Sequence, residues 1–217
     1  MDAQHVEFVY ESSEPHVQLR WQWRARAHFG PIEHSIQVVN LSPNELWLPL
    51  IDGLQVDWHL QPQAHIQTLY VEKGADIPSG KGTHLDAVEN GYRWMGRSTT
   101  YAHPIEGQAR EIIPSEIVFQ SGGLTTDSAT HDVGWCAGIE FSGRTRITLE
   151  RDAGSLGSVL GLNPELGPYR TRLLPNDTFL TPTVFLGAFS GTVDDAGQQL
   201  RGWVRKVLGN PKTWEDS

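Results

Sequence analysis

Residues Thr181–Leu208 read TPTVFLGAFSGTVDDAGQQLRGWVRKVL, and this stretch predicts a strand followed by the one strong amphipathic helix of the chain. The strand is expected over Thr183–Phe189. A helix is expected over Val193–Leu208, with Thr192 as its N-cap and Asp195 completing a variant of the capping box. Its apolar residues recur at a spacing of three or four, so one face of the helix must be buried against a sheet or a further domain. That face consists of Val193, Ala196, Leu200, Val204 and Val207.

The residues before this stretch predict strands and turns. The clearest strand is His16–Ala27, in which Val17, Leu19, Trp21, Trp23 and Ala25 alternate with polar residues, so one face should be buried and the other solvated. The strongest β-block is Gly134–Arg151, with a hairpin turn expected at Ser142–Gly143. Lys73–Gly96 and Ser121–Asp132 show no regular period and predict irregular loops. Further strands are expected over Glu33–Asn40, Leu46–Leu50, Leu54–Leu60, Ile66–Glu72, Ser98–Ala102, Ile112–Gln120, Gly157–Leu162 and Tyr169–Leu174. This order predicts an all-β sandwich or barrel-like fold, and not a βαβ fold.

Composition and charge exclude several classes of function. The chain has 217 residues and a net charge of −9, which argues against binding a nucleic-acid backbone. No segment approaches the roughly 20 apolar residues of a membrane span, and residues 1–15 do not have the pattern of a signal peptide. Cys136 is the single cysteine, which suits a core position in a reducing compartment. We therefore expect a cytoplasmic protein with no nucleic-acid or membrane partner.

Motifs for known catalytic chemistry do not occur. The sequence has no dinucleotide-binding, P-loop, zinc-protease or nucleophile-elbow pattern, and its nine histidines are scattered singly. We therefore expect no metal ion and no cofactor in this chain, whereas acid–base pairs can still form across strands at any distance in the sequence. Asp52, Asp57, Asp86 and Glu89 are carboxylates near expected loops, where turn chemistry is their ordinary role.

Aromatic and charged residues gather in the second half of the Lys73–Gly96 segment. Tyr92 and Trp94 flank Arg93, and Asp86 precedes them. Aromatic faces beside charged groups suit the apolar faces and hydroxyls of sugars. We therefore predict that Trp94, Tyr92, Arg93 and Asp86 form a carbohydrate-binding surface. The alternative is that Trp94 packs this segment onto the sheet.

The last third of the chain resembles a known family. GWCAGIEFSGRTRITLERD, GLNPEL and FLTPTVFLGAFSGTVDDAGQQLRGWVRKVL resemble the N-terminal domain of glycoside hydrolase family 36, the α-galactosidases and their relatives. The earlier segments LWLPLIDGLQVDWHL, LYVEKGADIPSGKGTH and GYRWMGRSTTY resemble the same domain. The resemblance implies an all-β fold, a large two-sheet antiparallel supersandwich similar to galactose mutarotase, with one C-terminal helix. It further implies a supersandwich over residues 1–190 and a helix and linker over 191–217.

The resemblance also implies what the chain does. In that family a (β/α)₈ barrel after this domain holds both carboxylates of a retaining glycosidase. The chain is then expected to be a non-catalytic domain that packs on the barrel of the same polypeptide and shapes the sugar site or an oligomer interface of the parent. Galactosides or oligosaccharides are the expected ligands. Two alternatives remain open, namely a freestanding carbohydrate-binding module and a mutarotase-like aldose epimerase.

Overall fold

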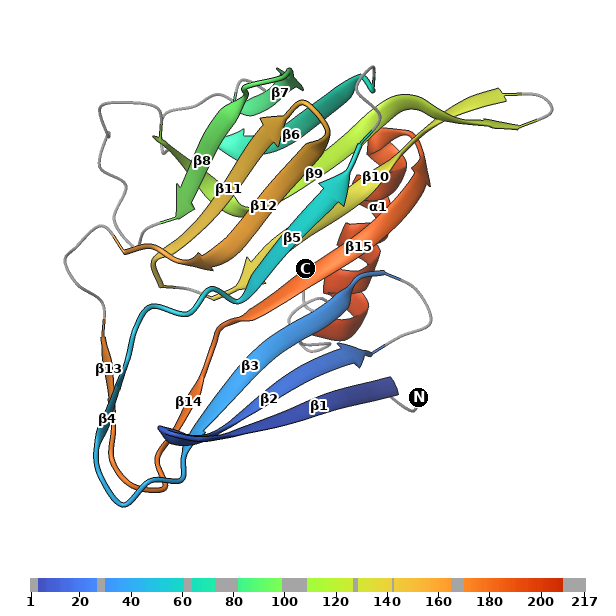
Figure 1. Cartoon of the computed structure of the whole chain (residues 1–217). Helices are drawn as coiled ribbons and strands as arrows, with labels where there is room; N and C mark the ends of the chain where they lie inside the picture. The colour runs from blue at the N-terminus through green and yellow to red at the C-terminus, as the bar shows by residue number, and fades with distance from the viewer. Residues whose placement is uncertain are drawn as a thin grey trace.

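The structure is a computed structural model, and it describes residues 4–26, 30–60, 64–72, 82–98, 109–126, 129–141, 143–164 and 170–208. Strands dominate the described residues, and one helical segment follows the last strand (Figure 1). The strands are β1 (Gln4–Ser13), β2 (His16–Ala25), β3 (Ile32–Asn40), β4 (Leu46–Leu48), β5 (Leu54–His59), β6 (Ile66–Glu72), β7 (Thr83–Val88), β8 (Arg93–Ser98), β9 (Ala109–Thr126), β10 (Ala129–Glu140), β11 (Thr145–Asp152), β12 (Ser155–Leu162), β13 (Thr171–Leu173), β14 (Thr178–Leu180) and β15 (Thr183–Gly191). The helix α1 (Val193–Trp203) continues into one π-helical turn, η1 (Val204–Leu208).

The strands form two antiparallel layers. The larger layer has the order β1-β2-β3-β15-β10-β9-β6-β7, and the smaller one has the order β8-β11-β12-β5. A short parallel contact between β8 and β9 joins the two layers at one edge. Figure 1 shows the smaller layer in front of β9, β10 and β15, with β1, β2 and β3 extending beyond it. The expected all-β supersandwich is thus confirmed.

Alternation along the strands explains the packing between the layers. On β10, Trp135, Ala137 and Ile139 face inward and join one core with Leu149 of β11 and Leu156 of β12. The rings of Trp135 and Trp58 stack across the two layers with centroids 4.4 Å apart. A period of two places the inward residues of β10 on one face of that strand.

The helix α1 covers the outer face of the larger layer. Cys136, Phe119 and Phe189 alternate with the inward residues and form a second core with Ala196 of α1. The predicted start of the helix is confirmed, because the Thr192 hydroxyl accepts from the backbone of Asp195, and the Asp195 carboxylate accepts from the backbone of Thr192.

The buried face of this helix differs from the prediction. Trp203 is fully buried, whereas Val204, which was expected on the buried face, is 38% exposed. The Trp203 ring lies 5.4 Å from the ring of Phe185 and against Gly30. The spacing of the smaller apolar residues predicted a face that includes Val204. The larger Trp203 side chain packs on the sheet instead. The division of the chain at residue 190 stays a prediction, and residues 209–217 lie outside the described ones.

Several local predictions are wrong. Within the segment expected to be irregular, Thr83–Val88 and Arg93–Ser98 are strands, while 73–81 lie outside the described residues. Most of Ser121–Asp132 belongs to β9 and β10. The chain does not form a hairpin near Gly143, because β10 pairs with β9 and β15 whereas β11 pairs with β8 and β12. The connection between β10 and β11 crosses from one layer to the other. A local turn signal does not distinguish such a crossover from a hairpin within one layer.

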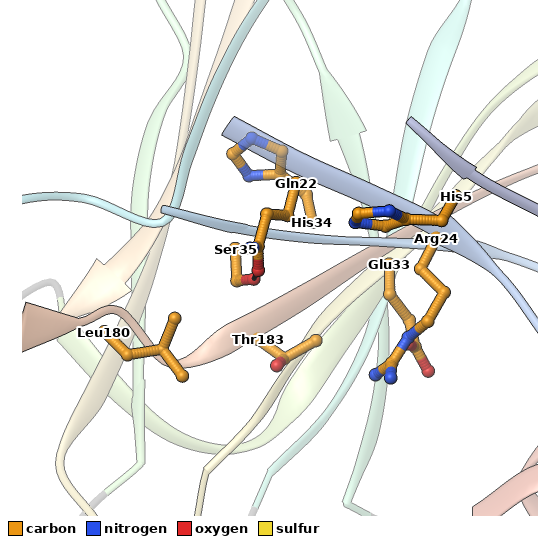
Figure 2. Close-up of a pocket in the computed structure, with 8 residues that line it drawn as sticks. All are labelled: His5, Gln22, Arg24, Glu33, His34, Ser35, Leu180 and Thr183. Atoms are coloured by element: carbon orange, nitrogen blue, oxygen red, sulfur yellow. Dashed lines mark hydrogen bonds and ion pairs between the residues drawn. The ribbon is translucent and has the colours of Figure 1, made fainter. Parts of the chain in front are cut away.

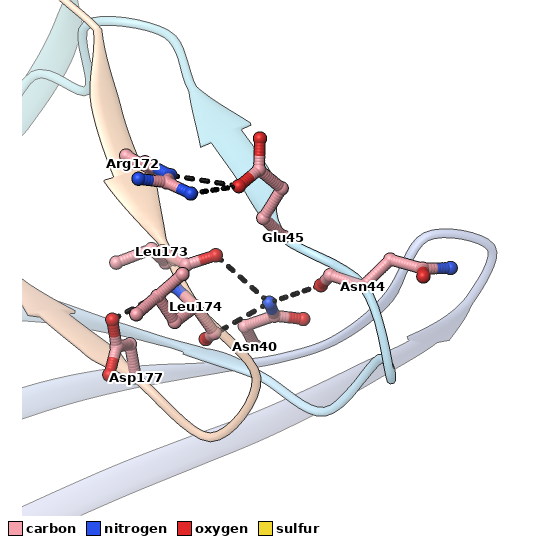
Figure 3. Close-up of polar contacts among 7 residues, drawn as sticks. All are labelled: Asn40, Asn44, Glu45, Arg172, Leu173, Leu174 and Asp177. Atoms are coloured by element: carbon pink, nitrogen blue, oxygen red, sulfur yellow. Dashed lines mark hydrogen bonds and ion pairs between the residues drawn. The ribbon is translucent and has the colours of Figure 1, made fainter.

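A polar cluster fixes the far end of β3, at Asn40. The Asn40 side chain is fully buried, and its amide donates to the carbonyls of Asn44, Leu173 and Leu174 at 2.8, 3.2 and 3.1 Å (Figure 3). Its oxygen accepts from Ser42. These bonds hold the short β4–β13 ribbon against the end of the larger layer.

Candidate functional site

The predicted carbohydrate-binding residues lie on β7, on β8 and just before β8. Trp94 is 7% exposed and belongs to the core between the two layers. Its ring lies 4.8 Å from that of Tyr70 on β6. Trp94 therefore packs this segment onto the sheet, which was the alternative interpretation, and its ring does not form a surface platform.

Asp86 and Tyr92 are brought together by a shared hydrogen-bond system. The Asp86 carboxylate accepts from the Tyr92 hydroxyl at 3.2 Å and from the Tyr70 hydroxyl at 3.0 Å. Arg93 lies on the opposite side of β8 from Trp94, and its guanidinium donates to Glu150 at 2.8 Å on the exposed surface. The four predicted residues therefore divide between the core, a half-buried tyrosine–aspartate network and the surface, and their sugar contact stays a prediction.

Among the other candidate carboxylates, Asp52 has a structural partner. Asp52 accepts two hydrogen bonds from Arg146, at 3.0 and 3.1 Å. Both bonds come from one guanidinium nitrogen, and they join the loop before β5 to β11. This contact represents the structural role that a carboxylate near a turn ordinarily has.

A pocket of about 220 Å³ lies elsewhere, along β2 and β3 near the start of β15. Its lining is mainly polar and comprises His5, Gln22, Arg24, Glu33, His34, Ser35, Leu180 and Thr183 (Figure 2). This volume is below the roughly 300–1,000 Å³ of sites for drug-sized ligands. The sequence interpretation did not single out these residues, because on β2 they belong to the strand face that was expected to be solvated.

Glu33 is the charged centre of that pocket. Its carboxylate is 2% exposed and lies 2.7 Å from the guanidinium groups of both Arg24 and Arg26. Arg26 also reaches Glu140 on β10, at 3.8 Å. Burial raises the pKa of Glu140 above its ordinary value, and the nearby negative charge of Glu33 raises it further. The carboxyl groups of Glu33 and Glu140 and the two guanidinium groups therefore form one network that links β2, β3 and β10.

The imidazole of His34 occupies the opposite face of β3. Its Nδ1 donates to the carbonyl oxygen of Gly53 at 2.8 Å, and its ring lies 4.2 Å from that of Trp23. Burial lowers the pKa of His34, although the hydrogen bond to Gly53 opposes that effect. A neutral imidazole that donates to a carbonyl fixes the loop before β5 against β3.

These residues give the pocket little capacity for acid–base chemistry. An aldose epimerase needs a general acid and a general base that converge on one substrate. Glu33 and His34 are of the right residue types, but the guanidinium groups of Arg24 and Arg26 occupy the Glu33 carboxylate and the Gly53 carbonyl engages His34. The geometry therefore favours a structural role for both residues.

Two kinds of feature are absent from the described residues. No group of three or more His, Cys, Asp or Glu side chains in them is placed to hold a metal ion. None of their helices is both long and apolar enough to cross a membrane. Cys136 is 5% exposed, and burial raises the pKa of its thiol, which opposes formation of a reactive thiolate.

Comparison with solved structures identifies the fold. The chain superposes on the α-galactosidase of Lactobacillus brevis with a TM-score of 0.68 and 20% identity, covering 94% of this chain and 25% of that one. It superposes on the family 36 α-galactosidase AgaA of Geobacillus stearothermophilus with a TM-score of 0.68 and 17% identity, covering 91% and 25%. The galactosidase domain of the α-galactosidase–sucrose kinase AgaSK gives 0.65 and 19%, covering 87% and 24%.

These matches share one pattern of coverage. The chain spans about a quarter of the length of each α-galactosidase, the quarter that forms the N-terminal domain. No protein-family model and no curated protein sequence matches it. The resemblance inferred from the sequence is thus confirmed as a resemblance of fold.

Proposed function

We propose that this chain is the non-catalytic N-terminal domain of a retaining α-glycosidase of the α-galactosidase type, and that it packs on the catalytic barrel of the same polypeptide. The observation that supports this most directly is the coverage. Nearly the whole chain matches only a quarter of each solved α-galactosidase. A fold is not a function by itself, so the proposal also depends on what the described residues lack.

The charged residues of the pocket support a non-catalytic role. A retaining glycosidase needs two carboxyl groups about 5–5.5 Å apart, one as nucleophile and one as acid and base, on either side of a sugar. In the pocket, Glu33 is buried beneath two arginines, and Arg26 lies between it and Glu140 in the ion-pair network. The catalytic pair is expected in the barrel.

The surface around β7 and β8 is the proposed contribution to the sugar site. Tyr92 and Arg93 lie beside each other in the chain, and Asp86 orients the Tyr92 hydroxyl. We assign Tyr92, Arg93 and Asp86 to the sugar-site rim, and Trp94 to holding them in place from the core. A cytoplasmic location stays part of the same proposal.

The test begins with the purified 217-residue chain and a nitrophenyl α-galactoside. No hydrolysis above buffer is expected, and turnover that survives repeated purification would overturn the proposal. The reading frame beyond Ser217 is the second test, and a following barrel of several hundred residues is expected.

Calorimetry with a panel of galactosides and oligosaccharides distinguishes the binding-module alternative. The isolated chain is expected to release no heat, because the rim alone forms only part of a site. Tight binding that Tyr92→Ala abolishes would favour a freestanding binding module. Acceleration of galactose mutarotation, followed by polarimetry, would instead favour the epimerase.

A further inference from the structure

The first strand, β1, forms an edge of the larger layer that is open to solvent. It pairs with β2 from Gln4 to Ser13, and all ten of its residues are exposed. Among the described strands it has no second neighbour, and Figure 1 shows it at the margin of the molecule. An exposed edge strand of this length is a template for pairing with another strand.

The backbone groups available on that edge follow from the bonds of β2. The amide of Leu41 donates to the carbonyl of His16, so the backbone groups of His16 point toward β3. Neighbouring residues of an antiparallel strand point their backbone groups to opposite sides. Odd-numbered residues of β2 therefore bond to β1, and through the observed register they engage its even-numbered residues. The free N–H and C=O groups of β1 belong to the odd-numbered residues His5, Glu7, Val9 and Glu11.

The side chains of the even-numbered residues form an apolar face. Val6, Phe8 and Tyr10 are 53%, 49% and 53% exposed, and Trp21 of β2 beside them is 40% exposed. The Tyr10 and Trp21 rings meet edge to face, 5.8 Å apart. We call these four residues the β1 face. A contiguous exposed apolar surface bordered by polar residues marks an interaction site.

We propose that the β1 face and the β1 edge bind a second copy of this chain, by antiparallel β1–β1 pairing about a two-fold axis at Phe8. The two larger layers then form one continuous sheet, and the same patch serves both copies, as a two-fold interface requires. In this register Phe8 lies opposite Phe8 of the second copy and Val6 lies opposite Tyr10. On the polar face, His5 lies opposite Glu11 and Glu7 lies opposite Val9.

Repulsion between like charges disfavours the two neighbouring registers, in which the axis passes through Glu7 or Val9. An axis at Glu7 would place the two Glu7 carboxylates opposite each other. An axis at Val9 would place Glu7 opposite Glu11, twice. Like charges directly opposite each other destabilise a strand pair. The axis at Phe8 avoids both contacts and places an imidazole opposite a carboxylate at each end.

The backbone pattern permits this register, as it permits any register that places odd-numbered residues opposite odd-numbered ones. With the axis at Phe8, the free groups of His5 and Glu7 meet those of Glu11 and Val9 of the second copy, so the ladder closes with hydrogen bonds. The Phe8 pair then occupies a non-hydrogen-bonded position, where opposed side chains approach most closely. Aromatic pairs at such positions contribute to sheet stability.

The first experiment is sedimentation velocity of the 217-residue chain over a concentration series. The wild-type chain is expected to dimerise reversibly. Phe8→Asp places two carboxylates on the axis and is expected to shift the chain to a monomer. Leu85→Asp is the matched control, because Leu85 is 54% exposed on β7 at the opposite end of the larger layer, and this variant is expected to remain dimeric.

A second experiment uses cysteines to read the register. Opposed residues of a non-hydrogen-bonded pair have Cα atoms about 4.5 Å apart, within the range of a disulfide. Phe8→Cys is expected to form a disulfide-linked dimer under mild oxidation. Val6→Cys is expected to stay unlinked, because the two Val6 positions would be about 14 Å apart along the strands. Cys136 is buried and should not interfere.

These outcomes separate this inference from the proposed function. A wild-type chain that stays monomeric at every concentration, or a dimer that survives Phe8→Asp, overturns the interface and leaves the glycosidase assignment untouched. Crosslinking of Val6→Cys in place of Phe8→Cys overturns the register. If the β1 face is covered instead by another domain of a longer polypeptide, Phe8→Cys does not crosslink in that polypeptide.

Discussion

Gly30 lies directly beneath Trp203, so that a Cβ atom added to Gly30 would be 2.7 Å from Cδ1 of the indole. The φ angle of Gly30 is +84°, a region that glycine adopts readily and other residues do not. This one contact joins the segment before β3 to the end of α1. It explains how the helix is seated on the sheet.

Gly30→Ala is expected to lower the free energy of unfolding by about 2–4 kcal/mol, through backbone strain and displacement of the indole. Urea denaturation followed by tryptophan fluorescence measures the change. Gly154→Ala is the control, because a Cβ there would meet no atom within 4 Å. An unchanged midpoint for Gly30→Ala would show that α1 is not held by this contact.

Glu33→Gln is expected to destabilise the fold by about 1–3 kcal/mol, less than the 3–5 kcal/mol of breaking a fully buried pair. The reduction arises because Arg24 and Arg26 are 44% and 29% exposed and can turn toward water. The exposed pair of Arg93 and Glu150 supplies the comparison, and Glu150→Gln should cost about 0–1 kcal/mol.

The same substitution has a second readout. Because the charge of Glu33 contributes to the raised pKa of Glu140, Glu33→Gln should lower that pKa toward its ordinary value. Carboxyl chemical shifts measured by NMR over a pH titration follow the change. A Glu140 pKa that does not move would mean that burial alone determines it.

His34 predicts a loss of stability in acid. Its pKa in the folded chain is lower than the ordinary value of 6.5, so between these two values the unfolded chain binds a proton that the folded chain does not. Stability should therefore fall as the pH decreases from 6.5 through that window. His34→Gln retains a donor for Gly53 and removes the titration. The difference in stability between the two proteins, measured by thermal melting, should be constant above pH 7 and should shift against the wild type as the pH falls through the window, whereas a difference that does not change with pH would contradict the assignment.

Cys136 should be inert in the folded chain, because burial raises the pKa of its thiol. A disulfide reagent is expected to label it only after denaturation, and the denatured chain provides the full-reaction control. Fast stoichiometric labelling under native conditions would show that the core between β10 and α1 opens readily.

The sequence predicted the elements whose signals are local. The strands predicted over His16–Ala27 and Ile66–Glu72 are close to the observed His16–Ala25 and Ile66–Glu72, and Thr192 with Asp195 predicted the helix start. β1 was missed, since its apolar residues Val6, Phe8 and Tyr10 stand in a segment interpreted only as lacking a signal peptide. The same alternation that identified β2 runs through it, so that signal could have been found.

Only the tertiary structure determined which faces of these strands are buried and which are exposed. The apolar side of β2 was expected to be buried, but β1, β2 and β3 extend beyond the smaller layer, so Trp21 remains 40% exposed. The polar side was expected to be solvated, but β3 places Glu33 beneath Arg24 and Arg26. A period of two along one strand fixes which side chains share a face, because it is a property of the local backbone. What covers that face depends on strands far away in the chain, and no local pattern contains that information.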